Sequence, residues 1–174
     1  MDTLITGSAY CCGDGITVYQ IIPESHWTMK KMDPDSMSDW VFETVESDCN
    51  GTPGAFKNKG YEIVVAGESF GCGSKSVEHP MAALKAAGIK VILAESVSRY
   101  SYRNAINLGI PVLICPGISQ MVHKNDVLSV DLSEGIIRNT TNGMICRTQG
   151  LSDFALSIIS SGGLISYIRK QINL

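Results

Sequence analysis

The chain has 174 residues, a length that suits one domain because it buries roughly 70% of the unfolded surface around a single core. Hydrophobic residues make up 44% of the chain, charged residues make up 18%, and the net charge is -3, as in an ordinary globular protein. A weakly acidic chain has no basic surface for a polyanion, so the composition argues against nucleic acid and anionic membranes as partners.

The N-terminus shows no targeting segment. Residues 1–10 contain no Lys or Arg ahead of their few apolar residues, and no stretch of the chain approaches the roughly 18 apolar residues of a membrane span. We therefore expect a cytoplasmic protein that does not span a membrane.

Six cysteines and three histidines are the side chains that a soft metal would need. No two cysteines have the Cys-x-x-Cys spacing typical of zinc and iron–sulfur sites, so we expect no metal site within this chain. Without a signal peptide the thiols are expected to stay reduced, and several of them to be buried. The cysteines are Cys11, Cys12, Cys49, Cys72, Cys115 and Cys146.

The first regular elements follow an irregular region at 28–60, for which we expect a short helix and a long surface loop. Short apolar runs then predict three buried strands, at 61–67, 90–94 and 110–115. Helix formers that end at a glycine predict helices between them, at 78–87 and 98–108. This alternation predicts right-handed crossovers, a mostly parallel sheet and an α/β fold.

The rest of the chain has a different pattern. Three short strand-like pieces, separated by Asp, Asn and Gly, predict antiparallel hairpins at 127–131, 135–139 and 143–148. Two helices are expected after them, at 151–161 and 164–171. The sequence contains no internal repeat, so residues 1–174 are interpreted as a single domain.

The segment Gly67–Ser76 joins a predicted strand to a predicted helix. Its backbone N–H groups and the helix N-terminus form a concavity that attracts anions, and Gly71 and Gly73 let the backbone approach a ligand closely. The alternative is a plain turn that uses glycine for its dihedral angles. Two phosphate motifs are excluded, because Ser74 stands where a P-loop has glycine, and Ser76 where a dinucleotide motif has its third glycine. A small anion such as a carboxylate remains as the ligand.

The loop opens a long series of motifs. These are Phe70-Gly71-Cys72-Gly73-Ser74, Glu78-His79, 82–89, Ala94-Glu95-Ser96 and Tyr102-Arg103-Asn104-Ala105-Ile106-Asn107. Together they resemble the small subunit of 3-isopropylmalate dehydratase, of the aconitase superfamily. Residues 13–23 and 163–168 are also similar to that family, and the resemblance is weakest at 28–60 and 117–150.

The resemblance implies a fold and a partner. The fold would be a three-layer β/β/α swivelling domain with a mostly parallel central sheet, as in the aconitase C-terminal domain. The chain would be the small subunit of a heteromeric hydro-lyase that isomerises a hydroxylated di- or tricarboxylic acid, such as 3-isopropylmalate, and that acts only with a large subunit. That large subunit would hold a [4Fe-4S] cluster as the Lewis acid, with no cofactor in this chain.

The resemblance also assigns the loop residues. Ser74 matches the serine base that removes a proton from the substrate, provided that its alkoxide is stabilised by cations and amides. Cys72 is expected to pack rather than to react, since nothing predicts a lowered thiol pKa. The substrate-binding loop would comprise Gly71, Cys72, Gly73, Lys75 and Ser76.

The chain departs from the family in two places. The family's loop runs Gly-Cys-Gly-Ser-Ser-Arg-Glu-His, whereas this loop is one residue longer and has no arginine. Lys75 either replaces the arginine's charge without its planar fork or is a solvated surface lysine. Upstream, the two acids of the family's Asp-Thr-Asp-Gln-Ile-Ile-Pro are missing at Thr17 and Tyr19. These changes favour either an altered substrate or a non-catalytic carboxylate-binding or regulatory paralogue.

Five further residues have alternative roles. His26 and Trp27 stand where the family reads the side group of its substrate, so either they line the pocket or they form a packed aromatic beside a surface histidine. Arg103 either points towards the site or braces the loop. Glu78 and His79 are interpreted as helix-start and supporting groups rather than as catalysts.

Overall fold

The computed structural model describes residues 3–27, 32–73 and 76–172. Its strands are β1 (Leu4–Cys12), β2 (Ile63–Ala66), β3 (Val91–Ala94), β4 (Val112–Ile114), β5 (Val127–Asp131), β6 (Ile136–Asn139) and β7 (Ile145–Arg147). Its α-helices are α1 (Val18–Ile21), α2 (Pro34–Ser38), α3 (His79–Ala86), α4 (Arg99–Asn107), α5 (Ile118–Met121), α6 (Asp153–Ser160) and α7 (Leu164–Gln171). Short 3-10 helices lie at Glu24–His26 and Lys57–Lys59.

The described strands form one seven-stranded sheet in the order β4-β3-β2-β1-β5-β6-β7. β1 joins its two halves, because residues 9–12 pair in parallel with β2 and residues 4–8 pair antiparallel with β5. Parallel pairing continues through β3 to β4, and antiparallel pairing through β6 to β7. The parallel strands and the hairpins predicted from the sequence are both confirmed, as the two halves of one mixed sheet.

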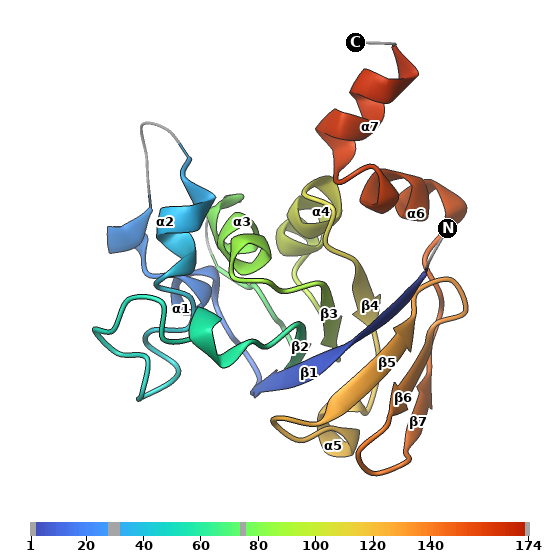
Figure 1. Cartoon of the computed structure of the whole chain (residues 1–174), viewed down its shortest axis with the longest axis horizontal. Coiled ribbons are helices and arrows are strands. Elements are labelled where there is room, and N and C mark those ends of the chain that lie inside the picture. Colours follow the sequence, from blue (N-terminus) through green and yellow to red (C-terminus); the bar gives the residue numbers. More distant parts are fainter. Residues whose placement is uncertain (1–2, 28–31, 74–75, 173–174) are drawn as a thin grey trace.

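Two hydrophobic clusters separate three layers. On one face of the parallel strands, Ile63 of β2 belongs to the same buried cluster as Leu128 of β5. On the other face, Val64 shares a cluster with Met81 of α3, and Figure 1 shows α3 and α4 covering this face. All four residues of β2 are buried because both of its faces are covered, which explains its continuous apolar sequence. The predicted β/β/α arrangement within an α/β fold is confirmed.

β1 is the strand that the sequence analysis missed. Its middle contains Gly7, Ser8 and Ala9, three residue types with low strand propensity. Pairing with β2 and β5 supplies the backbone hydrogen bonds that make this segment a strand, and its residue types give no indication of that pairing. Strand formation here depends on neighbours more than 50 residues away in the chain.

The short helix expected before β2 is present as α2 and the long irregular segment follows it, but part of this segment is buried rather than on the surface. Phe42 and Phe56 are only 0% and 1% exposed. Their rings lie 4.7 and 4.9 Å from the ring of Tyr10 on β1. The Tyr10 hydroxyl donates a 3.0 Å hydrogen bond to Glu46 in the same segment. Turns interrupt the periodicity that reveals burial in a sequence, so this part of the core was not predicted.

The two predicted C-terminal helices are confirmed as α6 and α7. Figure 1 shows α7 pointing away from the sheet, and its contacts with the body are to α6 and α4. The four-residue α5 was not predicted. Within the described ranges, no helix is long and apolar enough to cross a membrane.

The turn between α4 and β4 meets the turn between α6 and α7 backbone to backbone. A Cβ on Gly109 would lie 2.8 Å from the carbonyl carbon of Gly162, and Gly109 has a φ of 82°. Lys85 closes the same contact by donating hydrogen bonds to the carbonyl oxygens of Leu108 and Gly162. Any residue other than glycine at position 109 would push the two turns apart.

Gly109→Ala is therefore expected to lower the free energy of unfolding by about 2 kcal/mol more than Gly117→Ala, measured by urea denaturation. The two glycines have φ of 82° and 81°, so the conformational cost is matched, and a Cβ on Gly117 meets nothing within 4 Å. Equal losses in the two variants would contradict a role for the contact with Gly162.

Candidate active site

The candidate site is formed by three loops at the carboxyl ends of β1, β2 and β3, the edge of a parallel sheet where ligands usually bind. The loop after β2 is central. Its Gly71 N–H donates to the Ile16 carbonyl of the β1 loop at 2.7 Å, and its Phe70 N–H donates to the Ser96 carbonyl of the β3 loop at 3.0 Å. Short parallel bridges, Thr17 with Cys72 and Phe70 with Val97, run beside these bonds. The β2 loop is thus held from both sides.

The carbonyl of Gly71 is the most tightly held point of the loop. It accepts hydrogen bonds from the hydroxyls of Ser98 at 2.6 Å and Ser101 at 2.7 Å, both at the start of α4. Gly71 has a φ of 68°, and a Cβ at this position would lie 2.4 Å from Ser101 Oγ. Glycine is required here both by the backbone and by the hydroxyl that presses against it.

Cys72 follows Gly71 and makes two hydrogen bonds to the β1 loop and the start of α1. Its carbonyl accepts from the Val18 N–H at 2.8 Å, and its thiol donates to the Gly15 carbonyl at 3.6 Å. Cys72 is half-buried, whereas Gly73 and Ser76 are exposed. The predicted base Ser74 and the predicted carboxylate partner Lys75 lie outside the described residues.

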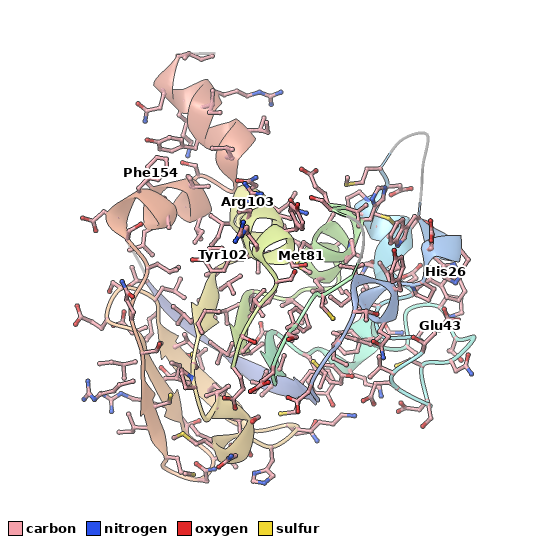
Figure 2. All side chains as sticks on the ribbon, turned by 180° about the vertical axis from the view of Figure 1, so that it is seen from behind. His26, Glu43, Met81, Tyr102, Arg103 and Phe154 are labelled. Carbon is pink, nitrogen blue, oxygen red and sulfur yellow. The ribbon has the colours of Figure 1, made fainter. Side chains whose placement is uncertain are left out.

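Arg103 and His26 have described contacts away from the loop. The Arg103 guanidinium lies 5.7 Å from the ring centroid of Tyr100 on α4 and is exposed. The His26 ring stacks on Trp40 at 4.0 Å, and its Nε2 lies 3.1 Å from a Glu43 carboxylate oxygen. In Figure 2 His26 and Glu43 lie together, on the opposite side of α3 from Arg103. The structure does not bring these two candidates together.

Trp27 and His79 do lie beside the loop. The His79 ring, at the first residue of α3, stacks on Trp27 at 5.3 Å, and Trp27 stacks on Tyr19 of α1 at 5.7 Å. Trp27 is buried and its Nε1 donates to the Ile22 carbonyl at 3.1 Å. These contacts match the interpretation of Trp27 as a packed aromatic.

Sequence analysis missed the polar groups that hold the loop. Besides Ser98 and Ser101, Asp14 accepts a 2.7 Å hydrogen bond from the Glu68 N–H. Glu95, which follows β3, holds the start of α5 rather than the β2 loop: it accepts from the N–H of Gly117 at 2.7 Å and from the hydroxyl and N–H of Ser119. The Ser119 hydroxyl and these backbone donors hold the pKa of Glu95 below its usual value. Ser98 had one sequence signal, since Ser before a helix is a preferred N-cap.

The described thiols are poor ligands for a metal cluster. Burial raises the pKa of Cys11 to about 11, and of Cys12 and Cys115 to about 12. A cluster ligand must be a thiolate, which burial opposes. Over the described ranges, no group of three or more His, Cys, Asp or Glu side chains is placed to hold a metal ion.

Comparison with known proteins gives consistent results. The profile of the aconitase C-terminal domain matches residues 29–115. The small subunit of isopropylmalate/citramalate isomerase from Methanocaldococcus jannaschii is 37% identical over 172 residues, which cover 99% of this chain and 98% of that protein. The 3-isopropylmalate dehydratase small subunit of Caldanaerobacter subterraneus is 40% identical, covering 95% and 98%. The 2,3-dimethylmalate dehydratase small subunit of Eubacterium barkeri is 34% identical, covering 93% and 94%.

The likeness extends to a solved structure. The crystal structure of 3-isopropylmalate dehydratase from M. jannaschii superposes with a TM-score of 0.82 at 28% identity, covering 97% of this chain and 95% of that chain. The similarity therefore extends over nearly the whole chain, including both halves of the mixed sheet.

The clamp on the Gly71 carbonyl predicts an unequal effect of two similar mutations. Ser101→Ala is expected to lower the free energy of unfolding by about 1–2 kcal/mol. Ser101 is 3% exposed, and the substitution removes the buried hydrogen bond from its hydroxyl to the Gly71 carbonyl. The control is Ser160→Ala, since the exposed Ser160 hydroxyl donates only within α6, to the Ser157 carbonyl. Urea denaturation compares the two variants. A loss at Ser101 no larger than that at Ser160 would show that the clamp contributes nothing to stability.

Proposed function

This chain belongs to the family of the aconitase C-terminal domain and of 3-isopropylmalate dehydratase small subunits, and we propose that it is the small subunit of a heteromeric hydro-lyase. The observation that carries the proposal is a similarity to such subunits over nearly the full length of the chain. The chain would act as a single domain, residues 1–174, on a site completed by a large subunit.

The proposed substrate is a hydroxylated dicarboxylic acid with an alkyl substituent. The named relatives act on isopropylmalate, citramalate or dimethylmalate, which are all alkyl-substituted malates. Dehydration and rehydration of such an acid, with exchanged positions of hydroxyl and hydrogen, gives isomerisation. The missing loop arginine and the missing N-terminal acids favour a different side group on the acid from that of the standard substrate.

Within this chain the chemistry would fall to the β2 loop. Ser74 would remove a proton from the carbon next to the hydroxyl-bearing carbon, and Lys75 would bind a carboxylate as a point charge. The described part of the loop supports these roles, because the clamped Gly71 carbonyl fixes the backbone three residues before Ser74. The α3 N-terminus, which begins shortly after the loop, favours negative charge at the same place.

A [4Fe-4S] cluster is assigned by this proposal to the large subunit. The described cysteines of this chain do not fit a cluster, since burial raises the thiol pKa of Cys11, Cys12 and Cys115 and the described thiols form no ligand group. When bound in the large subunit, the cluster would supply a Lewis acid for the hydroxyl that leaves.

The proposal predicts activity only in a mixture. The purified chain alone is expected to be inactive and to bind no iron. After mixing with a cluster-bearing large subunit from the same organism, the complex is expected to convert an alkyl-substituted malate. Turnover of several such acids, with iron and sulfide analysis of each component, is the measurement. A complex that forms and carries its cluster but converts none of the acids would favour the alternative of a non-catalytic, carboxylate-binding paralogue. Stoichiometric iron on this chain alone would contradict the assignment of the cluster.

In the active complex, Ser74→Ala is expected to lower kcat by at least about a hundredfold, which is the usual contribution of an acid–base group. Ser76→Ala, two residues further along the same loop, is the matched comparison and is expected to have a smaller effect. A larger loss at Ser76 would move the base to that residue, as the one-residue insertion in the loop permits. Circular dichroism of both variants confirms that the fold is retained.

A further inference from the structure

One polar atom beside the loop has no partner. The Nδ1 of His79 is sealed from solvent and makes no hydrogen bond to any described group. Buried polar atoms are almost always satisfied, and an unsatisfied one costs about 1–3 kcal/mol. We therefore expect the Nδ1 of His79, which lies next to the candidate active site, to gain a hydrogen-bond partner in the active enzyme.

The His79 ring is fixed in place by stacking. It lies nearly parallel to the Trp27 ring, at an angle of 10° and a centroid distance of 5.3 Å. Trp27 is itself anchored by its hydrogen bond to the Ile22 carbonyl and by stacking on Tyr19. Tilting the ring out of this plane would break the stack, whereas a partner that comes to Nδ1 leaves the stack intact.

The preceding turn is the place from which a partner can come. Side chains at the start of a helix lean back towards its N-terminus, which directs His79 towards residues 76–78. The Val77 carbonyl is already bonded to Asn104 at 2.8 Å. Ser76 is exposed and, among the described residues, its hydroxyl has no hydrogen-bond partner. That hydroxyl is the nearest donor in sequence that is free to reach Nδ1.

We propose that His79 is a positioning residue whose Nδ1 accepts a hydrogen bond from the Ser76 hydroxyl when the large subunit covers the loop. The proposal rests on the proposed function, because the covering subunit is part of it. In the free chain, water competes for the exposed Ser76 hydroxyl. Excluding this water strengthens the bond and fixes the C-terminal side of the loop, as Ser98 and Ser101 fix the other side.

Two substitutions separate the nitrogen from the ring. His79→Phe keeps an aromatic ring for Trp27 and removes Nδ1, whereas His79→Asn loses the ring and keeps a polar group near the place of Nδ1. In the active complex, His79→Phe should lower kcat about tenfold with KM changed by less than about twofold, and His79→Asn should retain kcat within about threefold. The control is His123→Phe, since the His123 side chain is 82% exposed. Wild-type kcat in His79→Phe, or a greater loss in His79→Asn, would overturn the proposal.

The named partner is tested by a double variant. If Ser76 and Nδ1 act as a pair, Ser76→Ala combined with His79→Phe should lose no more kcat than the more damaging single variant. If the loss of kcat in the double variant equals the product of the losses in the two single variants, the pairing is overturned.

A second measurement does not depend on turnover. The chain has three histidines, so the Nδ1 resonance of His79 can be assigned by substitution in a histidine-labelled sample. This resonance should shift on assembly with the large subunit in the wild type and not in Ser76→Ala. A complex that is inactive but shows the shift would contradict the proposed function and support the pair. An active complex without the shift would support the proposed function and contradict the pair.

Discussion

The structure depends on β1 being shared between two kinds of sheet. Its C-terminal half pairs in parallel with β2 and its N-terminal half pairs antiparallel with β5. Because one strand serves both halves, the antiparallel strands pack against one face of the parallel strands and leave the other face to the helices. The parallel strands then have two covered faces, which forces them to be apolar at nearly every position.

The same arrangement places the candidate site. Adjacent parallel strands end at the same edge of a sheet, so the loops after β1, β2 and β3 emerge side by side. Their backbone groups satisfy one another, as in the bonds of Gly71 to Ile16 and Phe70 to Ser96. These bonds hold the described residues of the β2 loop in place, and a fixed backbone is what the proposed binding of an anion by loop amides would require.

The elements that sequence analysis found have local signals. β2 and β3 are short apolar runs because both faces are covered, and the β2 loop shows its glycines and hydroxyls in one continuous stretch. The elements that it missed depend on distant contacts. β1 is a strand because of its pairing with β2 and β5. Phe42 is packed against Tyr10 by a segment of turns, in which buried residues do not recur at a regular spacing. Ser101 holds Gly71 from 30 residues away, a distance at which no spacing rule applies.

These long-range contacts also limit what the inserted loop residue can do. The loop is anchored before the insertion by the carbonyls of Gly71 and Cys72, and after it by the Val77 carbonyl and the stacked His79 ring. Since both anchors belong to the packed body, the extra residue must be accommodated between them. In the proposed function Lys75 would bind a carboxylate as a point charge, whereas the arginine of the family's loop has a planar fork, so the two cations would not hold the acid in the same geometry.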